Sequence, residues 1–229
     1  YPDAMEEAWK LFRKTAYSSL YSYPRFTWQT VIPDQRRISK IDLSDDYLQA
    51  IRLYASCADE LKSSELYRND LIEFVSYYVA AKAENFYKQA LKDDLENRVL
   101  AAQRNLQQTV DLLMDVDRLL ASHPLYRLEE WVELARNSGT TLQEKDAYEA
   151  NAKRLITSWG GIQEDYAARF WSGLIKDYYI PRIQLYFTKD RNEIREWEEQ
   201  WITSPWSNST TPFDDPVEAA LSLIEKTNK

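Results

Sequence analysis

Residues 94–121, with the sequence DLENRVLAAQRNLQQTVDLLMDVDRLLA, decide the fold class of this chain. Apolar side chains recur through the stretch every three or four residues, at Leu95, Val99, Ala102, Leu106, Val110, Leu113 and Leu120. That period places them along one face of an α-helix about four turns or more in length. An apolar face of this length needs other helices to cover it, so the stretch predicts a helical bundle.

Stretches with the same period lie on both sides of it. The expected helices cover residues 3–21, 44–61, 66–86, 128–138, 141–158, 165–179, 191–201 and 215 onward. Asp3 and Ser44 are suited to cap the first two, Glu144 supports the start of the helix after Thr141, and Ser138-Gly139 is a typical helix end. Because most breaks are short and no strand alternation is present, we expect an all-α antiparallel bundle or array of about eight helices.

One connection does not fit this pattern. Residues 22–43 lose the helical period and are rich in aromatic residues and proline, with Tyr23, Pro24, Phe26, Trp28 and Pro33. An ordered loop of this length usually has a function. We expect residues 1–229 to form a single all-helical domain that includes this loop.

Composition excludes several classes of protein. Only four glycines occur among 229 residues, too few for the turns of a dinucleotide-binding fold or a phosphate-binding loop. The net charge of −8 and the absence of a Lys/Arg cluster argue against nucleic acid as a partner. No apolar run is long enough to span a membrane. One cysteine and one histidine leave almost no His/Cys metal site, and we expect no metal and no cofactor.

The chain begins Tyr1-Pro2-Asp3 without an initiator methionine, so we expect it to be a piece of a longer protein whose compartment its first residues do not reveal.

Carboxylates stand side by side at three places, Glu129-Glu130, Glu198-Glu199 and Asp214-Asp215. Neighbours on a helix point about 100° apart, so we expect these pairs on solvated faces or at helix N-termini. We expect His123, at a helix break beside Pro124, to be structural rather than a general base, and Cys57 to be a small core residue rather than a reactive thiol.

The most informative local feature is the bend Trp159-Gly160-Gly161, which is followed by Gln163 and Tyr166. An aromatic face can cover the apolar side of a sugar ring, while amide and phenol groups bond to its hydroxyls. The same residues would also fit a simple turn in which Trp159 fills the gap between two helices. Residue types alone leave both interpretations open.

Residues 148–187, YEANAKRLITSWGGIQEDYAARFWSGLIKDYYIPRIQLYF, resemble the C-terminal helical domain of the α-N-acetylglucosaminidases of glycoside hydrolase family 89. The matching motifs are Trp159-Gly160, Asp165-Tyr166-Ala167, Trp171-Ser172-Gly173-Leu174, Asp177-Tyr178-Tyr179 and Pro181-Arg182. Residues 67–71 and 112–136 fit the same domain. The resemblance covers about residues 3–190, and residues 190–229 depart from the family pattern.

The resemblance implies a role in a retaining, two-carboxylate hydrolysis of terminal α-linked N-acetylglucosamine. The family's catalytic glutamates lie in a (β/α)8 barrel that precedes the helical domain, so this chain is expected to contribute no catalytic residue. Carried over by position, Trp159, Tyr166 and Gln163 would line the sugar pocket. The implied partners are the catalytic barrel of the same parent chain and a glycan with terminal N-acetylglucosamine, and the implied location is exported or lysosomal.

Two further functions stay open. The first is a free-standing helical protein-interaction module whose aromatic patches bind a partner. The second is an independent helical enzyme, which would need two acids that converge across the bundle. An open reading frame that extends several hundred residues upstream would favour the glycosidase domain over the module.

Overall fold

The computed structural model describes residues 2–18, 26–30, 45–159, 165, 167–207 and 209–228. Within these residues the chain forms ten α-helices and no β-strand, which confirms the all-α prediction. The helices are α1 (Asp3–Lys14), α2 (Asp45–Ala55), α3 (Ala58–Leu61), α4 (Glu65–Leu95), α5 (Val99–Leu120), α6 (Leu128–Asn137), α7 (Leu142–Leu155), α8 (Ile180–Tyr186), α9 (Arg191–Thr203) and α10 (Pro216–Lys226). A 3₁₀ turn, η1 (Thr27–Gln29), lies between α1 and α2, and a π-helical turn, η4 (Ile175–Tyr179), runs directly into α8.

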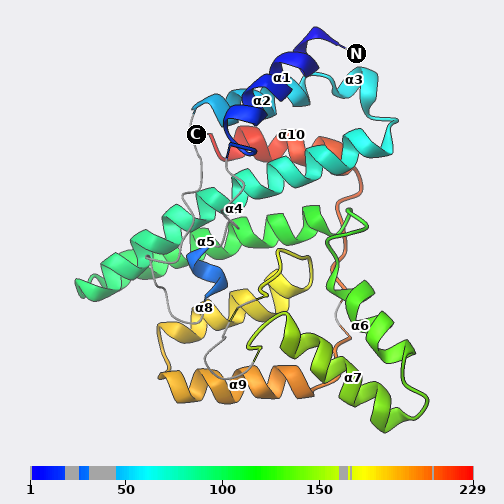
Figure 1. The fold of residues 1–229 in the computed structure, drawn as a ribbon. Helices are drawn as coiled ribbons and strands as arrows, with labels where there is room; N and C mark the ends of the chain where they lie inside the picture. The colour runs from blue at the N-terminus through cyan, green and yellow to red at the C-terminus, as the bar shows by residue number, and fades with distance from the viewer. Residues whose placement is uncertain are drawn as a thin grey trace.

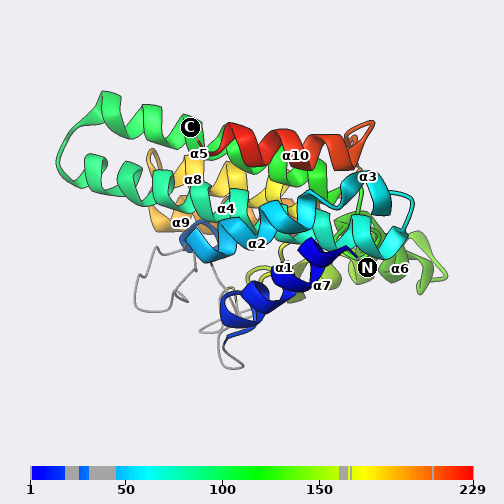
Figure 2. The ribbon, with the colours of Figure 1, turned by 90° about the horizontal axis from the view of Figure 1, so that it is seen from above.

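The two longest helices, α4 and α5, form an antiparallel pair at the centre (Figure 1). On one side α1 packs on α2, which contacts α4, and α10 lies along α4 (Figure 2). On the other side α8 contacts both α5 and α9, and α7 packs between α6 and α9. One hydrophobic core links these layers, from Met5 in α1 to Ile224 in α10.

The predicted stripe on residues 94–121 is correct over most of its length and wrong at its start. Leu113 and Leu120 are fully buried, but Leu95 is 83% and Val99 58% exposed. The chain reverses between them at Asn97, whose φ of 58° lies in the left-handed region. Leu95 therefore ends α4, Val99 begins α5, and both lie at the projecting tip of the hairpin.

Several helix ends also differ from the prediction. Helix α1 ends at Lys14 rather than near residue 21. Directly after Lys14, the Thr15 hydroxyl donates to the Leu11 carbonyl and the Thr15 backbone leaves the helical region. Asp3 lies in the first turn and does not cap the helix. The single helix expected over residues 44–61 is two helices within residues 45–61, and Ser44 lies outside the described residues.

The caps predicted for the second half are confirmed. Thr141 and Glu144 form a capping box at the start of α7, and α6 ends just before Ser138-Gly139. Glu144 accepts from the backbone N–H groups of both Thr140 and Thr141. The Thr140 hydroxyl, which also donates to Glu144, together with these backbone bonds lowers the pKa of Glu144 to about 2 and keeps its carboxylate charged.

The predicted helix over residues 165–179 is wrong in its first half. Asp165 has a φ of 58° and Gly173 a φ of 83°, and neither value is helical. The buried Asp117 carboxylate of α5 accepts hydrogen bonds from the Gly173 and Lys176 backbone N–H groups at 2.8 and 3.0 Å. A side chain from another helix thus determines where this helical segment begins.

The part of the aromatic loop that the structure describes packs inward. Phe26 is 2% exposed and Trp28 fully buried, and the Trp28 ring contacts Tyr179 edge to face. Glu84 of α4 accepts from both the backbone N–H and the hydroxyl of Thr27, which fixes η1 on α4. Tyr23, Pro24 and Pro33 lie outside the described residues. In the described part of the chain, no helix combines the length and hydropathy that a bilayer crossing requires.

Candidate functional site

Of the three predicted sugar-contacting residues, the structure describes Trp159, while Gln163 and Tyr166 lie outside the described residues. Trp159 follows the end of α7, and its backbone N–H donates to the Arg154 carbonyl at 2.9 Å. Trp159 is 37% exposed, so part of the residue is open to solvent.

Two described residues of the segment 159–167, which we call the elbow, have an unusual backbone. Trp159 has a φ of 55° and Asp165 a φ of 58°, although neither residue is glycine. Such conformations cost on the order of 1–3 kcal/mol each and persist where the surroundings enforce them. At Asp165 one restraint is its backbone N–H, which donates to the carbonyl of the fully buried Thr157 at 3.1 Å.

The second restraint on Asp165 is a buried ion pair. Its Oδ1 lies 2.8 Å from Nη1 of Arg182, and the two residues are 3% and 2% exposed. The same Nη1 donates to Glu198 Oε1 at 2.9 Å, and the Tyr178 hydroxyl also donates to that oxygen, at 2.7 Å. We call Asp165, Tyr178, Arg182 and Glu198 the Arg182 cluster. It joins the elbow to α8 and α9.

A fourth contact extends the cluster to the aromatic loop, because Arg182 Nη2 donates to the Gln29 carbonyl at 2.8 Å. Burial alone would lower the pKa of Arg182, but the neighbouring Asp165 and Glu198 raise it well above its ordinary value. The guanidinium is therefore charged, and it needs its carboxylates. Removing one partner of a buried ion pair typically costs about 3–5 kcal/mol.

The Arg182 cluster contradicts one prediction. Glu198 was expected on a solvated face but is only 6% exposed. Its position in α9 carried a signal, because Ile194 and Ile202, one turn before and one turn after it, are buried with it. The other two pairs behave as expected: Glu129 and Glu130 lie in the first turn of α6, and Asp215 is the N-cap of α10.

Residues of the motifs that carried the resemblance meet in these contacts. Asp165, Tyr178 and Arg182 form most of the cluster, and the neighbouring Asp177 accepts from the Trp206 indole N–H at 3.0 Å. Trp206 comes from residues 190–229, the segment expected to depart from the family pattern, and it packs against Gly173. The motifs therefore also encode a buried framework that holds Asp165.

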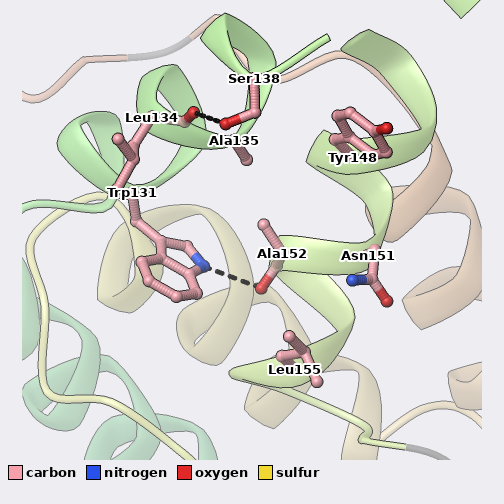
Figure 3. Close-up of a pocket in the computed structure, with 8 residues that line it drawn as sticks. All are labelled: Trp131, Leu134, Ala135, Ser138, Tyr148, Asn151, Ala152 and Leu155. Atoms are coloured by element: carbon pink, nitrogen blue, oxygen red, sulfur yellow. Dashed lines mark hydrogen bonds between the residues drawn. The ribbon is translucent and has the colours of Figure 1, made fainter. Parts of the chain in front are cut away.

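A shallow apolar groove of about 330 Å³ lies between α6 and α7 (Figure 3). It is lined by Trp131, Leu134, Ala135, Ser138, Tyr148, Asn151, Ala152 and Leu155. The Trp131 indole N–H donates to the Ala152 carbonyl at 2.9 Å and holds the two helices together. No carboxylate lines the groove, so it offers no acid or base for hydrolysis.

His123 and Cys57, the two other side chains considered for chemistry, are structural. His123 is 4% exposed, its Nδ1 accepts from the Leu125 backbone N–H at 3.1 Å, and burial lowers its pKa. Cys57 is 2% exposed and burial raises the pKa of its thiol, which confirms it as a core residue. Across the residues that the structure describes, no three His, Cys, Asp or Glu side chains group closely enough to hold a metal ion.

Comparison with known proteins gives one consistent family. The family described as alpha-N-acetylglucosaminidase (NAGLU) C-terminal domain matches residues 1–226. The expectation that residues 190–229 depart from the family pattern is therefore wrong up to residue 226. The human protein alpha-N-acetylglucosaminidase is 29% identical over 257 aligned positions, which cover 99% of this chain and 33% of the human protein. The chain thus spans about a third of the length of that relative.

Two solved structures of Clostridium perfringens enzymes share the fold. A family 89 glycoside hydrolase in complex with 2-acetamido-1,2-dideoxynojirimycin superimposes with a TM-score of 0.83 at 21% identity, over 98% of this chain and 30% of that chain. A second structure, in complex with its substrate GlcNAc-alpha-1,4-galactose, gives a TM-score of 0.81 with the same coverage and identity. These likenesses show that the helical architecture is shared.

Proposed function

The chain belongs to the family of α-N-acetylglucosaminidase C-terminal domains, and on that premise we propose that residues 1–229 act as one accessory domain that completes the sugar pocket of a larger glycosidase. The ligand is a glycan with a terminal α-linked N-acetylglucosamine. The partner is a catalytic (β/α)8 barrel of the same parent chain. The threefold greater length of the human relative supports a missing catalytic part.

The observation that carries the proposal is the partial exposure of Trp159 just after the end of α7. A flat aromatic surface suits the C–H face of a sugar ring. Gln163 and Tyr166, which follow in the sequence, supply an amide and a phenol that can bond to hydroxyls. In this proposal the three residues form one wall of the pocket.

The domain itself performs no proton transfer. A retaining glycosidase needs two free carboxyl groups about 5–5.5 Å apart on either side of the bond that breaks. Asp165 and Glu198 are close to each other, since both bond to Nη1 of Arg182. Both are also buried and bonded to that guanidinium, so neither is free to act on a sugar. In this proposal the catalytic glutamates belong to the barrel, as the resemblance implies.

A free-standing protein-interaction module is the alternative, and the apolar groove between α6 and α7 is the observation in its favour. The two functions differ in a simple assay. The isolated chain should not hydrolyse an aryl α-N-acetylglucosaminide, whereas the full-length protein should. Hydrolysis by the isolated chain would refute this division of labour, and no hydrolysis by the full-length protein would favour the module.

The role of Trp159 has its own test in the full-length enzyme. Trp159→Ala should raise KM roughly two- to tenfold, the loss expected for one aromatic contact. Tyr186→Ala is the matched control, because Tyr186 on α8 is 38% exposed against 37% for Trp159. Its KM should stay at the wild-type value. Equal kinetics for the two variants would show that Trp159 does not contact the sugar.

A further inference from the structure

We propose that the groove between α6 and α7 binds an amphipathic α-helix from the outer ring of the catalytic (β/α)8 barrel in the parent chain. The inference rests on the proposed function for the identity of the partner, and it adds the surface on which that partner docks. All eight residues that line the groove are uncharged, although 29% of the chain is charged. An uncharged, exposed apolar surface of this kind is typical of a protein contact.

The groove has the residue spacing of a helix-binding surface. Each of its two helices contributes four side chains at positions i, i+3, i+4 and i+7, which lie along one helix face. The Trp131 indole N–H, which donates to the Ala152 carbonyl at 2.9 Å, holds the two helices together (Figure 3). The lining residues are Trp131, Leu134, Ala135 and Ser138 of α6 and Tyr148, Asn151, Ala152 and Leu155 of α7. Two adjacent helices that line one groove in this way can receive a third helix, as in a helical bundle.

The sizes of the lining side chains also suit a helix. Ala135, Ser138 and Ala152 are small, so the backbone of a docked helix can come close to both α6 and α7. Leu134 is 65% and Tyr148 44% exposed, so the described part of the chain leaves both side chains largely uncovered. These two larger side chains can pack against the sides of a docked helix.

The length of the relatives and the position of the groove point to the parent chain as the source of this helix. This chain covers about a third of the human relative and of the family 89 structure, so most of each relative lies outside the match. A (β/α)8 barrel carries an outer ring of α-helices. Trp159, the proposed pocket wall, donates from its backbone N–H to the Arg154 carbonyl in the last turn of α7. A barrel that holds the sugar against Trp159 therefore lies beside the end of the groove that Leu155 lines.

Cysteine labelling of the full-length enzyme tests whether the groove is covered. Ser138→Cys places a thiol in the groove, and Ser63→Cys is the matched control in the turn between α3 and α4, since both serines are exposed in this chain. Peptide mass spectrometry measures the iodoacetamide rate of each thiol in the native enzyme, relative to the same variant in urea. The thiol at position 138 should react at least about tenfold more slowly than the thiol at position 63, because a docked helix must first move away. Equal relative rates would overturn the inference.

A photo-crosslink from position 148 identifies the occupant. Tyr148 is replaced by p-benzoylphenylalanine in the full-length enzyme, and a mixture of isotope-labelled and unlabelled enzyme is irradiated and analysed by mass spectrometry. The mixture separates links within one molecule from links between two molecules. A link within one molecule to a helix of the catalytic part supports the inference. A link to a second copy, or no link to any other part of the enzyme, overturns it.

The inference and the proposed function can fail separately. If the full-length enzyme hydrolyses an aryl α-N-acetylglucosaminide while the two thiols react equally fast, only the inference is rejected. If the thiol at position 138 is protected and the link within one molecule forms, but the enzyme hydrolyses nothing, the proposed function is rejected and the groove remains a contact with the parent chain.

Discussion

Replacement of Gly173 by alanine tests how tightly Trp206 and Leu128 pack against Gly173. Gly173 begins the segment that leads through η4 to Arg182, and its φ is 83°. An added β-carbon would lie 3.1 Å from Cζ2 of Trp206 and 3.2 Å from Cβ of Leu128. Both atoms belong to rigid parts of well-packed side chains, so neither can move aside freely.

The expected cost combines two terms. An L-residue in the left-handed region costs about 1–2 kcal/mol, and overpacking of a filled site costs typically 1–3 kcal/mol. The lower entropy of alanine in the unfolded chain returns about 0.4–1 kcal/mol. The free energy of unfolding should therefore fall by about 1–5 kcal/mol, which for a chain of this size lowers Tm by very roughly 2–20 °C.

Urea unfolding of the purified chain, followed by circular dichroism, measures this change. Ser172→Ala is the control, because it adds no atom and removes only a hydroxyl that donates to Asp117 at 3.3 Å. It should lower the free energy of unfolding by no more than about 1 kcal/mol. If Gly173→Ala costs no more than Ser172→Ala, the contacts with Trp206 and Leu128 are not rigid and the reasoning fails.

Two further predictions concern the buried histidine and cysteine. Burial lowers the pKa of His123 below its ordinary value of 6.5, so below pH 6.5 the unfolded state binds more protons and the chain loses stability as the pH falls. His123→Asn, which keeps an acceptor for Leu125 and does not titrate, should show a smaller decrease in Tm between pH 7 and pH 5, and an unchanged decrease would contradict the assignment. Cys57 is buried and its thiol pKa is raised, so it should resist iodoacetamide in the native chain and react after unfolding. Mass spectrometry measures the alkylation, and rapid alkylation of the native protein would place Cys57 at the surface.

The sequence predicts the helices best where local signals agree. The apolar period of α5 and the capping box of Thr141 and Glu144 are properties of neighbouring residues, and the structure confirms both. The failures occur where distant residues decide. The start of the helical segment near residue 174 depends on Asp117, which lies more than 50 residues earlier in the sequence.

The candidate site divides in the same way. Trp159 could be selected from residue type and from the resemblance, and its exposure agrees with a surface role. The Arg182 cluster could not be assembled from sequence, because its members come from three separate segments, its contact with Gln29 adds a fourth, and only folding brings them together. The sequence did contain one local sign: Glu198 lies four residues from both Ile194 and Ile202, on the helix face that is buried.

The most direct test of the central claim is the inhibition constant of free N-acetylglucosamine, measured in the full-length enzyme with tryptophan, phenylalanine or alanine at position 159. Phenylalanine keeps a flat aromatic face and alanine removes it. If the indole covers the sugar ring, Trp159→Phe should bind nearly as well as the wild type and Trp159→Ala up to about tenfold more weakly. Identical constants for all three proteins would contradict the claim that this domain supplies a wall of the sugar pocket.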